Sequence, residues 1–209
     1  MGVTDMKNLL GYQSTEYDCG PTTLINAIRY LFEREEIPPE IIKTITLYCL
    51  DGYNESGEAG KSGTTAMAMV FLSSWLNQFG KIKRFPIYTS ILEQKDIYIG
   101  QNSAIVECLQ QGGCAIVRVM LEGGHYVLLT DADDEYIYLF DPYYDEVRFG
   151  EGIDVICNAP KKMNRRVKKE IFNSEGASDY AFGEIDLREC MLLYNTGTRK
   201  TIDTIEYII

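Results

Sequence analysis

Apolar residues recur at helical spacing through the first half of the chain. Residues 22–34 place Leu24, Ile25, Ile28, Leu31 and Phe32 on one face, which predicts a helix. Pro38-Pro39 stops this helix and opens a second one from Glu40 to about Leu50. Thr64-Thr65 is an N-cap signal for a long helix through Phe79, which we expect Gly80 to end. Ser103–Gln111 is predicted as a short helix, and 81–98 as short extended or irregular structure.

The second half of the chain carries short apolar runs that are typical of strands. They cover 114–121, 125–130 and 136–141, with 145–149 as a candidate fourth strand and 191–194 as a further one. Short polar turns between successive runs predict an antiparallel sheet. Helices followed by strands indicate an α+β fold. We expect one domain over 1–209, with a helical half at about 1–112 and a sheet half at about 113–209.

The chemistry of the chain centres on the segment Gln13-Ser14-Thr15-Glu16-Tyr17-Asp18-Cys19-Gly20-Pro21. A side-chain amide, Gln13, precedes a thiol, Cys19, by six positions. Because Pro21 suits the first turn of a helix, Cys19 is expected at a helix N-terminus. The unsatisfied N–H groups and the helix dipole there favour a thiolate, which makes Cys19 a candidate nucleophile. Asp18 places a negative charge beside the thiol, and we assign it no catalytic role.

A thiolate needs a base, and the chain has a single histidine, His125. It begins the predicted strand after Gly123-Gly124, and Asp141 follows sixteen residues later at the end of the next strand. A hairpin formed by these strands could bring the Asp141 carboxylate back to the imidazole. Asp145 is a nearby alternative for that position. Thiol, imidazole, carboxylate and amide are the parts of a cysteine acyl-transfer site.

These residues resemble a known family. Gln13, Asp18-Cys19-Gly20, His125-Tyr126-Val127 and Asp141-Pro142 are similar to the motifs of the C39 peptidases, the bacteriocin-processing branch of the papain-like cysteine peptidases, and of their free-standing relatives. The likeness covers 10–34 and 113–145. It implies a papain-like fold, in which a helical half carries the thiol and a sheet half carries histidine and aspartate, with the site in the cleft between them. Bacteriocin-type relatives cut after a double glycine but are usually fused to an ATP-driven exporter, which this chain lacks.

The resemblance implies a role for each residue. Cys19 attacks a peptide or amide carbonyl, His125 transfers protons, Asp141 orients the imidazole, and Gln13 stabilises the oxyanion with the Cys19 N–H. Gly20, Gly124 and Tyr126 flank the reactive groups and are expected to contact substrate. Two alternatives stay open: an acyltransferase or transamidase on the same triad, and a non-catalytic peptide-binding module.

The composition of the chain disfavours some classes of binding partner. The net charge of −11 disfavours nucleic acid and anionic membranes as partners, and no apolar run reaches the length of a membrane span. The N-terminal residues lack a signal-peptide pattern, so the sequence predicts a cytoplasmic protein, and a processed, secreted form stays an alternative. The cluster of basic residues at 161–169 is expected to be a solvated surface.

The six cysteines form no C-x-x-C pair, and a single histidine leaves too few ligands for a zinc site. We therefore predict no metal and no cofactor. Apart from Cys19, the thiols are expected to be mostly buried and reduced: Cys49, Cys108, Cys114, Cys157 and Cys190.

Overall fold

A computed structural model of the chain describes residues 8–144 and 149–199. The helices are α1 Cys19–Leu31, α2 Pro39–Tyr48, α3 Ala66–Lys83, α4 Ala104–Gln110 and α5 Lys169–Phe172, with short 3₁₀ turns at η1 Arg34–Glu36, η2 Gln94–Asp96 and η3 Ile185–Leu187. The strands are β1 Ile87–Glu93, β2 Cys114–Met120, β3 Gly124–Ala132, β4 Tyr136–Phe140, β5 Ile153–Val155, β6 Arg165–Lys168 and β7 Glu189–Asn195.

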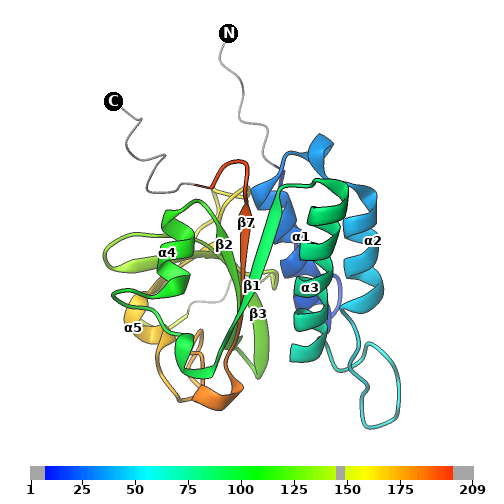
Figure 1. Ribbon diagram of the computed structural model, residues 1–209. Helices are drawn as coiled ribbons and strands as arrows, with labels where there is room; N and C mark the ends of the chain where they lie inside the picture. Colours follow the sequence, from blue (N-terminus) through cyan, green and yellow to red (C-terminus); the bar gives the residue numbers. More distant parts are fainter. Residues whose placement is uncertain (1–7, 145–148, 200–209) are drawn as a thin grey trace, which may run out of the picture.

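The strands form one sheet in the order β1-β7-β2-β3-β4-β6-β5, and every neighbouring pair is antiparallel. Helices α1, α2 and α3 lie on one side of the sheet and α4 and α5 on the other (Figure 1). The protein is therefore a mixed structure of helices and antiparallel sheet, as the sequence predicts. None of the helices in the described ranges is both long and apolar enough to cross a membrane.

Both faces of the central strands are buried, which explains why β2 and β3 read as continuous apolar runs. Along β3, Leu128 packs with α1, α2 and α3, whereas Val127 and Leu129 pack with α4 and Phe172. Successive side chains of a strand point to opposite faces, so one strand serves two cores. The helices of the first half and the later segments of the chain are thereby fixed to the same sheet.

The predicted helices and the strands at 114–121, 125–130, 136–141 and 191–194 are confirmed within a few residues. One prediction was wrong, and another was less specific than the structure. Helix α3 continues past Gly80 to Lys83, and a Cβ at Gly80 would lie 2.9 Å from the Phe85 carbonyl oxygen, so this glycine allows β1 to approach the helix. Strand β1 forms within 81–98 and pairs with β7, so the sheet begins inside the predicted helical half. The candidate strand at 145–149 lies mostly outside the described residues.

Candidate active site

Cys19 is the first residue of α1, as predicted, and only 8% of its surface is exposed. The preceding loop is folded around the Asp18 carboxylate, which accepts hydrogen bonds from the Ser14 and Thr15 backbone N–H groups and from the Thr15 hydroxyl. Helix α1 then starts with the Thr22 N–H bonded to the Asp18 carbonyl oxygen at 3.0 Å. Asp18 therefore shapes the loop that carries Gln13 and holds the start of the thiol helix.

Strand register explains how Asp141 reaches the histidine. Leu128 on β3 pairs with Phe140 on β4, so the next residue, Asp141, lies opposite Val127. His125 and Val127 are two positions apart and therefore point to the same face of the sheet. Diagonal neighbours on one face are within reach of each other, and the His125 Nε2–Asp141 Oδ1 distance is 2.7 Å.

The Asp141 carboxylate is 1% exposed and is held from several sides. Tyr180 donates its hydroxyl to Oδ2 at 2.7 Å, and the Tyr143 N–H donates to Oδ1 at 2.8 Å. Asn164 bonds both backbone groups of Asp141, accepting from its N–H and donating to its carbonyl oxygen, each at 2.7 Å. These bonds leave the carboxylate one orientation, with Oδ1 toward His125.

Further hydrogen bonds hold the thiol helix and the segment before it against the rest of the site. The Thr23 hydroxyl of α1 donates to the Tyr126 carbonyl oxygen of β3 at 2.9 Å, in a buried position. Asn26 of α1 exchanges two hydrogen bonds of 2.8 Å with the backbone of Gly11. The Gln13 N–H donates to the Pro142 carbonyl oxygen at 2.8 Å, which joins the loop before Cys19 to the segment that follows Asp141.

The Cys19 sulfur and the His125 ring interact by hydrogen bond and by charge. Burial alone would raise the pKa of the Cys19 thiol, but the interaction with His125 and the N–H groups of Tyr126 and Gly20 lower it below its ordinary value of 9.0. Burial would lower the pKa of His125, but Asp141 and Cys19 outweigh it and raise this pKa to about 9. Each group therefore stabilises the charged form of the other, a thiolate on Cys19 and an imidazolium on His125.

The thiol opens into a cavity of about 490 Å³. Gln13, Cys19, Gly124 and His125 all line it, together with Glu16, Leu121, Glu122, Tyr143, Phe149, Gly150 and Asp179. The Gln13 side-chain nitrogen donates to the Thr15 carbonyl oxygen at 2.9 Å, and its Oε1 is buried without a hydrogen-bond partner among the described residues. An amide nitrogen carries two hydrogens, so the bond to Thr15 uses only one of them.

The three residues expected to contact substrate are placed differently from one another. Gly124 lines the thiol cavity. Gly20 is buried outside that lining, and a Cβ there would lie 2.1 Å from the Thr64 hydroxyl, so its missing side chain serves the packing of α1. Tyr126 is buried, and its hydroxyl donates to Glu189 instead of reaching the thiol cavity.

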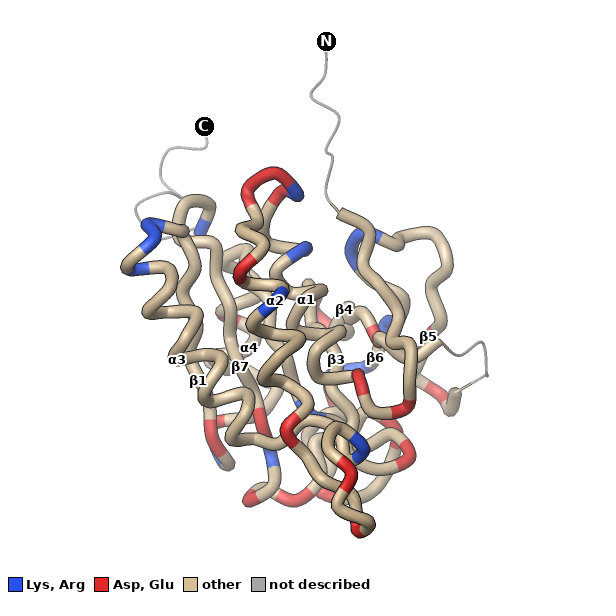
Figure 2. The backbone as a smooth tube through the Cα atoms, turned by 90° about the vertical axis from the view of Figure 1, so that its right-hand side faces the viewer, with Lys and Arg blue, Asp and Glu red and all other residues tan. Residues whose placement is uncertain are grey.

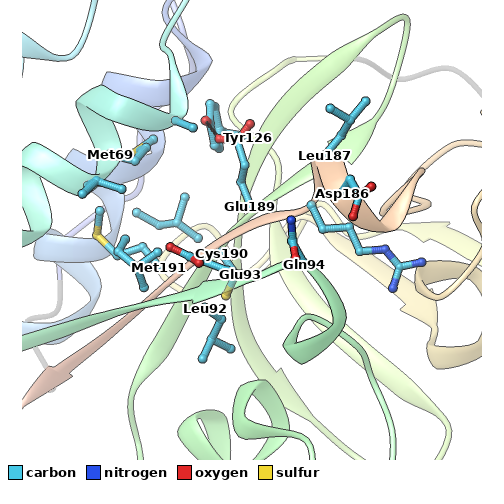
Figure 3. A pocket seen from close by; sticks show the side chains of 15 residues that line it. Met69, Leu92, Glu93, Gln94, Tyr126, Asp186, Leu187, Glu189, Cys190 and Met191 are labelled. Carbon is cyan, nitrogen blue, oxygen red and sulfur yellow. Dashed lines mark hydrogen bonds between the residues drawn. The ribbon is translucent and has the colours of Figure 1, made fainter.

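Tyr126 lines a second cavity, of about 320 Å³, between α3, β1 and β7. Figure 3 shows Tyr126 near Glu189, Met69 and Met191 on the helix side, and Gln94 and Asp186 on the opposite side. Pairing of Met120 with Gly124 and of Glu93 with Glu189 puts the ends of β2 and β1 and the starts of β3 and β7 at one end of the sheet. Both cavities therefore open at the same end of the molecule.

Several residues that hold the site were not found by sequence reasoning. Asn26 could have been recognised from the sequence, because it is a polar residue among the apolar residues of α1. The structure buries it to 1% exposure. Thr23, Asn164 and Tyr180 could not have been recognised in this way, since they meet the site only through tertiary contacts. The alternative carboxylate, Asp145, lies outside the described residues.

All six cysteines are free, and all but Cys157 are buried. Within residues 8–144 and 149–199, no group of three or more His, Cys, Asp or Glu side chains is placed to hold a metal ion.

No protein-family model matches the sequence, and no curated protein matches it. Among solved structures, this chain is similar to the crystal structure of a double glycine motif protease from an AMS/PCAT transporter in complex with the leader peptide. That match has a TM-score of 0.41 and 14% sequence identity, and it covers 92% of this chain and 94% of the other. A double-glycine protease is the kind of enzyme that the Gln13, Cys19, His125 and Asp141 motif resembles, but a likeness this distant assigns no family.

Proposed function

We propose that the protein is a cysteine peptidase or amidase with a papain-like arrangement, in which Cys19 is the nucleophile. The observation that carries this proposal is the buried row of Cys19, His125 and Asp141. Its aspartate is 2.7 Å from the imidazole, and the pKa of its thiol is lowered despite burial. A buried thiol without such partners has a raised pKa, and a structural cysteine has no need of an oriented imidazole.

In the proposed reaction, the Cys19 thiolate attacks the substrate carbonyl carbon. Asp141 occupies His125 Nε2, so the other ring nitrogen, Nδ1, is the one that serves the thiol and the leaving group. The imidazolium gives its proton to the leaving amine as the C–N bond breaks, and a thioester remains on Cys19. His125 then takes a proton from water, which attacks the thioester and releases the acid and the thiol.

The proposed oxyanion site is formed by Gln13 and the backbone N–H of Cys19. Cys19 opens α1, so its N–H has no partner within the helix. Gln13 lines the same cavity as the thiol, and its side-chain nitrogen has a hydrogen beyond the one bonded to Thr15. Preorganised donors of this kind stabilise the negative charge that develops on the carbonyl oxygen.

The test is reaction with a thiol-directed probe, followed by turnover. Limiting iodoacetamide at pH 6 should alkylate Cys19 before the other five cysteines, as peptide mass spectrometry would show, because the Cys19 thiol has a lowered pKa. A screen of short peptide amides should then give hydrolysis that Cys19→Ala abolishes. Activity should rise as the thiol ionises and decline above pH of about 9 as His125 loses its proton.

Alkylation of Cys19 no faster than that of exposed Cys157 would contradict the proposal. Product analysis with an added amine separates hydrolysis from acyl transfer, because a transferase would form a new amide in place of the free acid.

A further inference from the structure

Tyr126 connects the surroundings of the thiol, which line the larger cavity, with the smaller cavity. The backbone N–H of Tyr126 contacts the Cys19 sulfur, while its side chain lines the smaller cavity. On the other wall, Ala66 lines the smaller cavity and follows closely after Thr64, which contacts Gly20 beside the thiol. We infer that an extended substrate chain over the thiol would reach the larger cavity on one side and the smaller cavity on the other.

The position of His125, the general acid of the proposed reaction, assigns each cavity to one side of the scissile bond. In the proposed reaction, His125 must protonate the leaving amine, so the leaving group lies on the histidine side. His125 lines the larger cavity and is not part of the lining of the smaller one. The smaller cavity is consequently the one available to the acyl side of the substrate.

The smaller cavity combines an apolar wall with carboxylates. Its apolar wall includes Met69, Ile91, Ile116 and Met191, and its carboxylates are Glu93, Asp186 and Glu189. Arg188 is its one basic lining residue among those described, and its guanidinium donates to the carbonyl oxygens of Gly183, Ile97 and Asn173 at 2.9–3.0 Å. Arg118 lies 3.7 Å from Glu189 and offsets part of one negative charge.

The charged residues that line the larger cavity are also negative. Glu16, Glu122 and Asp179 line it, all three are exposed, and no lysine or arginine occurs among its described lining residues. Figure 2 shows Asp and Glu predominating at the lower end of the molecule, where the loop before α3 lies, while Lys and Arg gather more at the upper end. The whole chain carries a net charge of −11. Charge of one sign around a cleft attracts ligands of the opposite sign.

We propose that the substrate is a basic peptide whose acyl-side residue is lysine or arginine. This inference rests on the proposed function, because the cavities are assigned through the acyl-transfer geometry. The aliphatic stem of such a residue would pack against Met69 and Met191, and its charged end would reach Glu93, Asp186 or Glu189. Long basic side chains pack in this way, with an apolar stem along apolar surface and a charged head at the polar rim. Further basic residues on the leaving side would meet Glu122 and Asp179.

The experiment measures binding to the Cys19→Ala protein by calorimetry, so that it does not depend on turnover. Three acetylated octapeptides alternate glycine with one other residue, which is lysine, norleucine or glutamate. Norleucine keeps the aliphatic stem of lysine and lacks its charge. The lysine peptide should bind about tenfold more tightly than the norleucine peptide at 20 mM NaCl, because several exposed ion pairs each add a modest amount. The glutamate peptide should bind most weakly.

Salt and a matched pair of variants separate local from overall charge. The preference for lysine should shrink severalfold at 0.5 M NaCl, since salt screens exposed charges. On the Cys19→Ala background, Glu122→Gln with Asp179→Asn should weaken the lysine peptide about fivefold and leave the norleucine peptide unchanged. The control, Asp134→Asn with Glu170→Gln, removes the same charge beyond the far end of β3, about 30 Å away, and should change binding less than twofold.

Norleucine binding as tight as lysine at low salt overturns the inference, and so does an equal loss of affinity in both double variants. Either result leaves the thiol chemistry intact if Cys19 is still alkylated first. Conversely, selective binding of the lysine peptide together with an unreactive Cys19 would support a binding site for basic peptides and contradict the proposed peptidase activity.

Discussion

Cys19 and Cys49 are two buried thiols near Thr64. Their pKa values are shifted in opposite directions from the ordinary value of a thiol. A side chain at Gly20 would collide with Thr64, and the Thr64 hydroxyl lies 3.6 Å from the Cys49 sulfur. Burial raises the pKa of Cys49 to about 12, although the hydrogen bond with Thr64 acts in the opposite direction. Burial acts on Cys19 in the same direction, yet its pKa is lowered.

The difference comes from what surrounds each sulfur. Cys19 opens α1, where N–H groups point outward, whereas Cys49 follows the last residue of α2, where carbonyl groups do. The helix dipole therefore favours a negative sulfur at Cys19 and disfavours it at Cys49. Cys19 also has the His125 ring, which provides both a hydrogen bond and a positive charge. Partners that stabilise the anion, more than depth of burial, separate a nucleophile from a structural thiol.

Removing the imidazole should have the largest effect on the difference in reactivity between Cys19 and Cys49. His125→Ala takes away the largest effect that lowers the Cys19 pKa, so we expect Cys19 to alkylate at pH 6 far more slowly than in the unsubstituted protein, and hydrolysis to fall by about 10³-fold. Iodoacetamide labelling followed by mass spectrometry measures the first, and peptide turnover the second. A Cys19 that keeps its labelling rate would show that the helix N-terminus alone activates it.

Asp141→Asn should have the next largest effect. An asparagine amide removes the negative charge that raises the His125 pKa, and activity should fall by about 10²-fold or more while the fold persists. Rates across the pH range check this, because the alkaline limit of activity should move below pH 9 as the imidazolium becomes a stronger acid. Asp133→Asn at the far end of the hairpin is the control and should leave the pH profile in place.

Gln13→Ala tests the oxyanion site and leaves the thiol and the imidazole in place. If the amide stabilises the oxyanion, kcat should fall by about 10²-fold while Cys19 still alkylates at the normal rate. Gln78→Ala, an exposed position on α3, is the matched control. Full activity in Gln13→Ala would leave the backbone N–H of Cys19 as the remaining donor.

The sequence was sufficient for the parts of the site that are set by local pattern. Cys19 at a helix start follows from Pro21 and the apolar face of α1, and the place of Asp141 follows from the length of the β3–β4 hairpin. For 81–98 the sequence predicts only extended or irregular structure and does not identify strand β1, because nothing local shows that it pairs with β7, about a hundred residues later in the chain. The sequence places the end of α3 too early, because Gly80 allows contact with β1 and does not end the helix.

The contacts that orient the groups of the candidate site could not be predicted, because each joins distant segments. Tyr180 reaches Asp141 across 39 positions of sequence, and Thr23 reaches Tyr126 across 103. Neither residue type is unusual where it stands in the chain. Tertiary packing alone gives these residues their place at the site.

A titration of the single histidine tests which of the two thiols interacts with it. Cys19→Ala removes a negative partner, so the pKa of His125 should fall below about 9. Cys49→Ala removes a thiol that stays protonated and should leave that pKa unchanged. With one histidine in the chain, the imidazole C–H signals in NMR need no assignment. An unchanged pKa in Cys19→Ala would show that the two groups do not interact electrostatically.

The smallest expected effect belongs to Tyr180, which does not contact the thiol and acts only through Asp141. Its hydroxyl donates to Oδ2 and so draws negative charge away from Oδ1, the atom that faces His125. Tyr180→Phe should concentrate the charge on Oδ1 and raise the His125 pKa above about 9, with a few-fold loss of activity from the freer carboxylate. Tyr138→Phe removes a hydroxyl bonded to Asp133 on the same hairpin and should shift nothing. A His125 pKa that is equal in both variants would reduce Tyr180 to a packing residue, whereas a rise in Tyr180→Phe alone would show that a buried hydroxyl adjusts the basicity of the histidine beside Cys19.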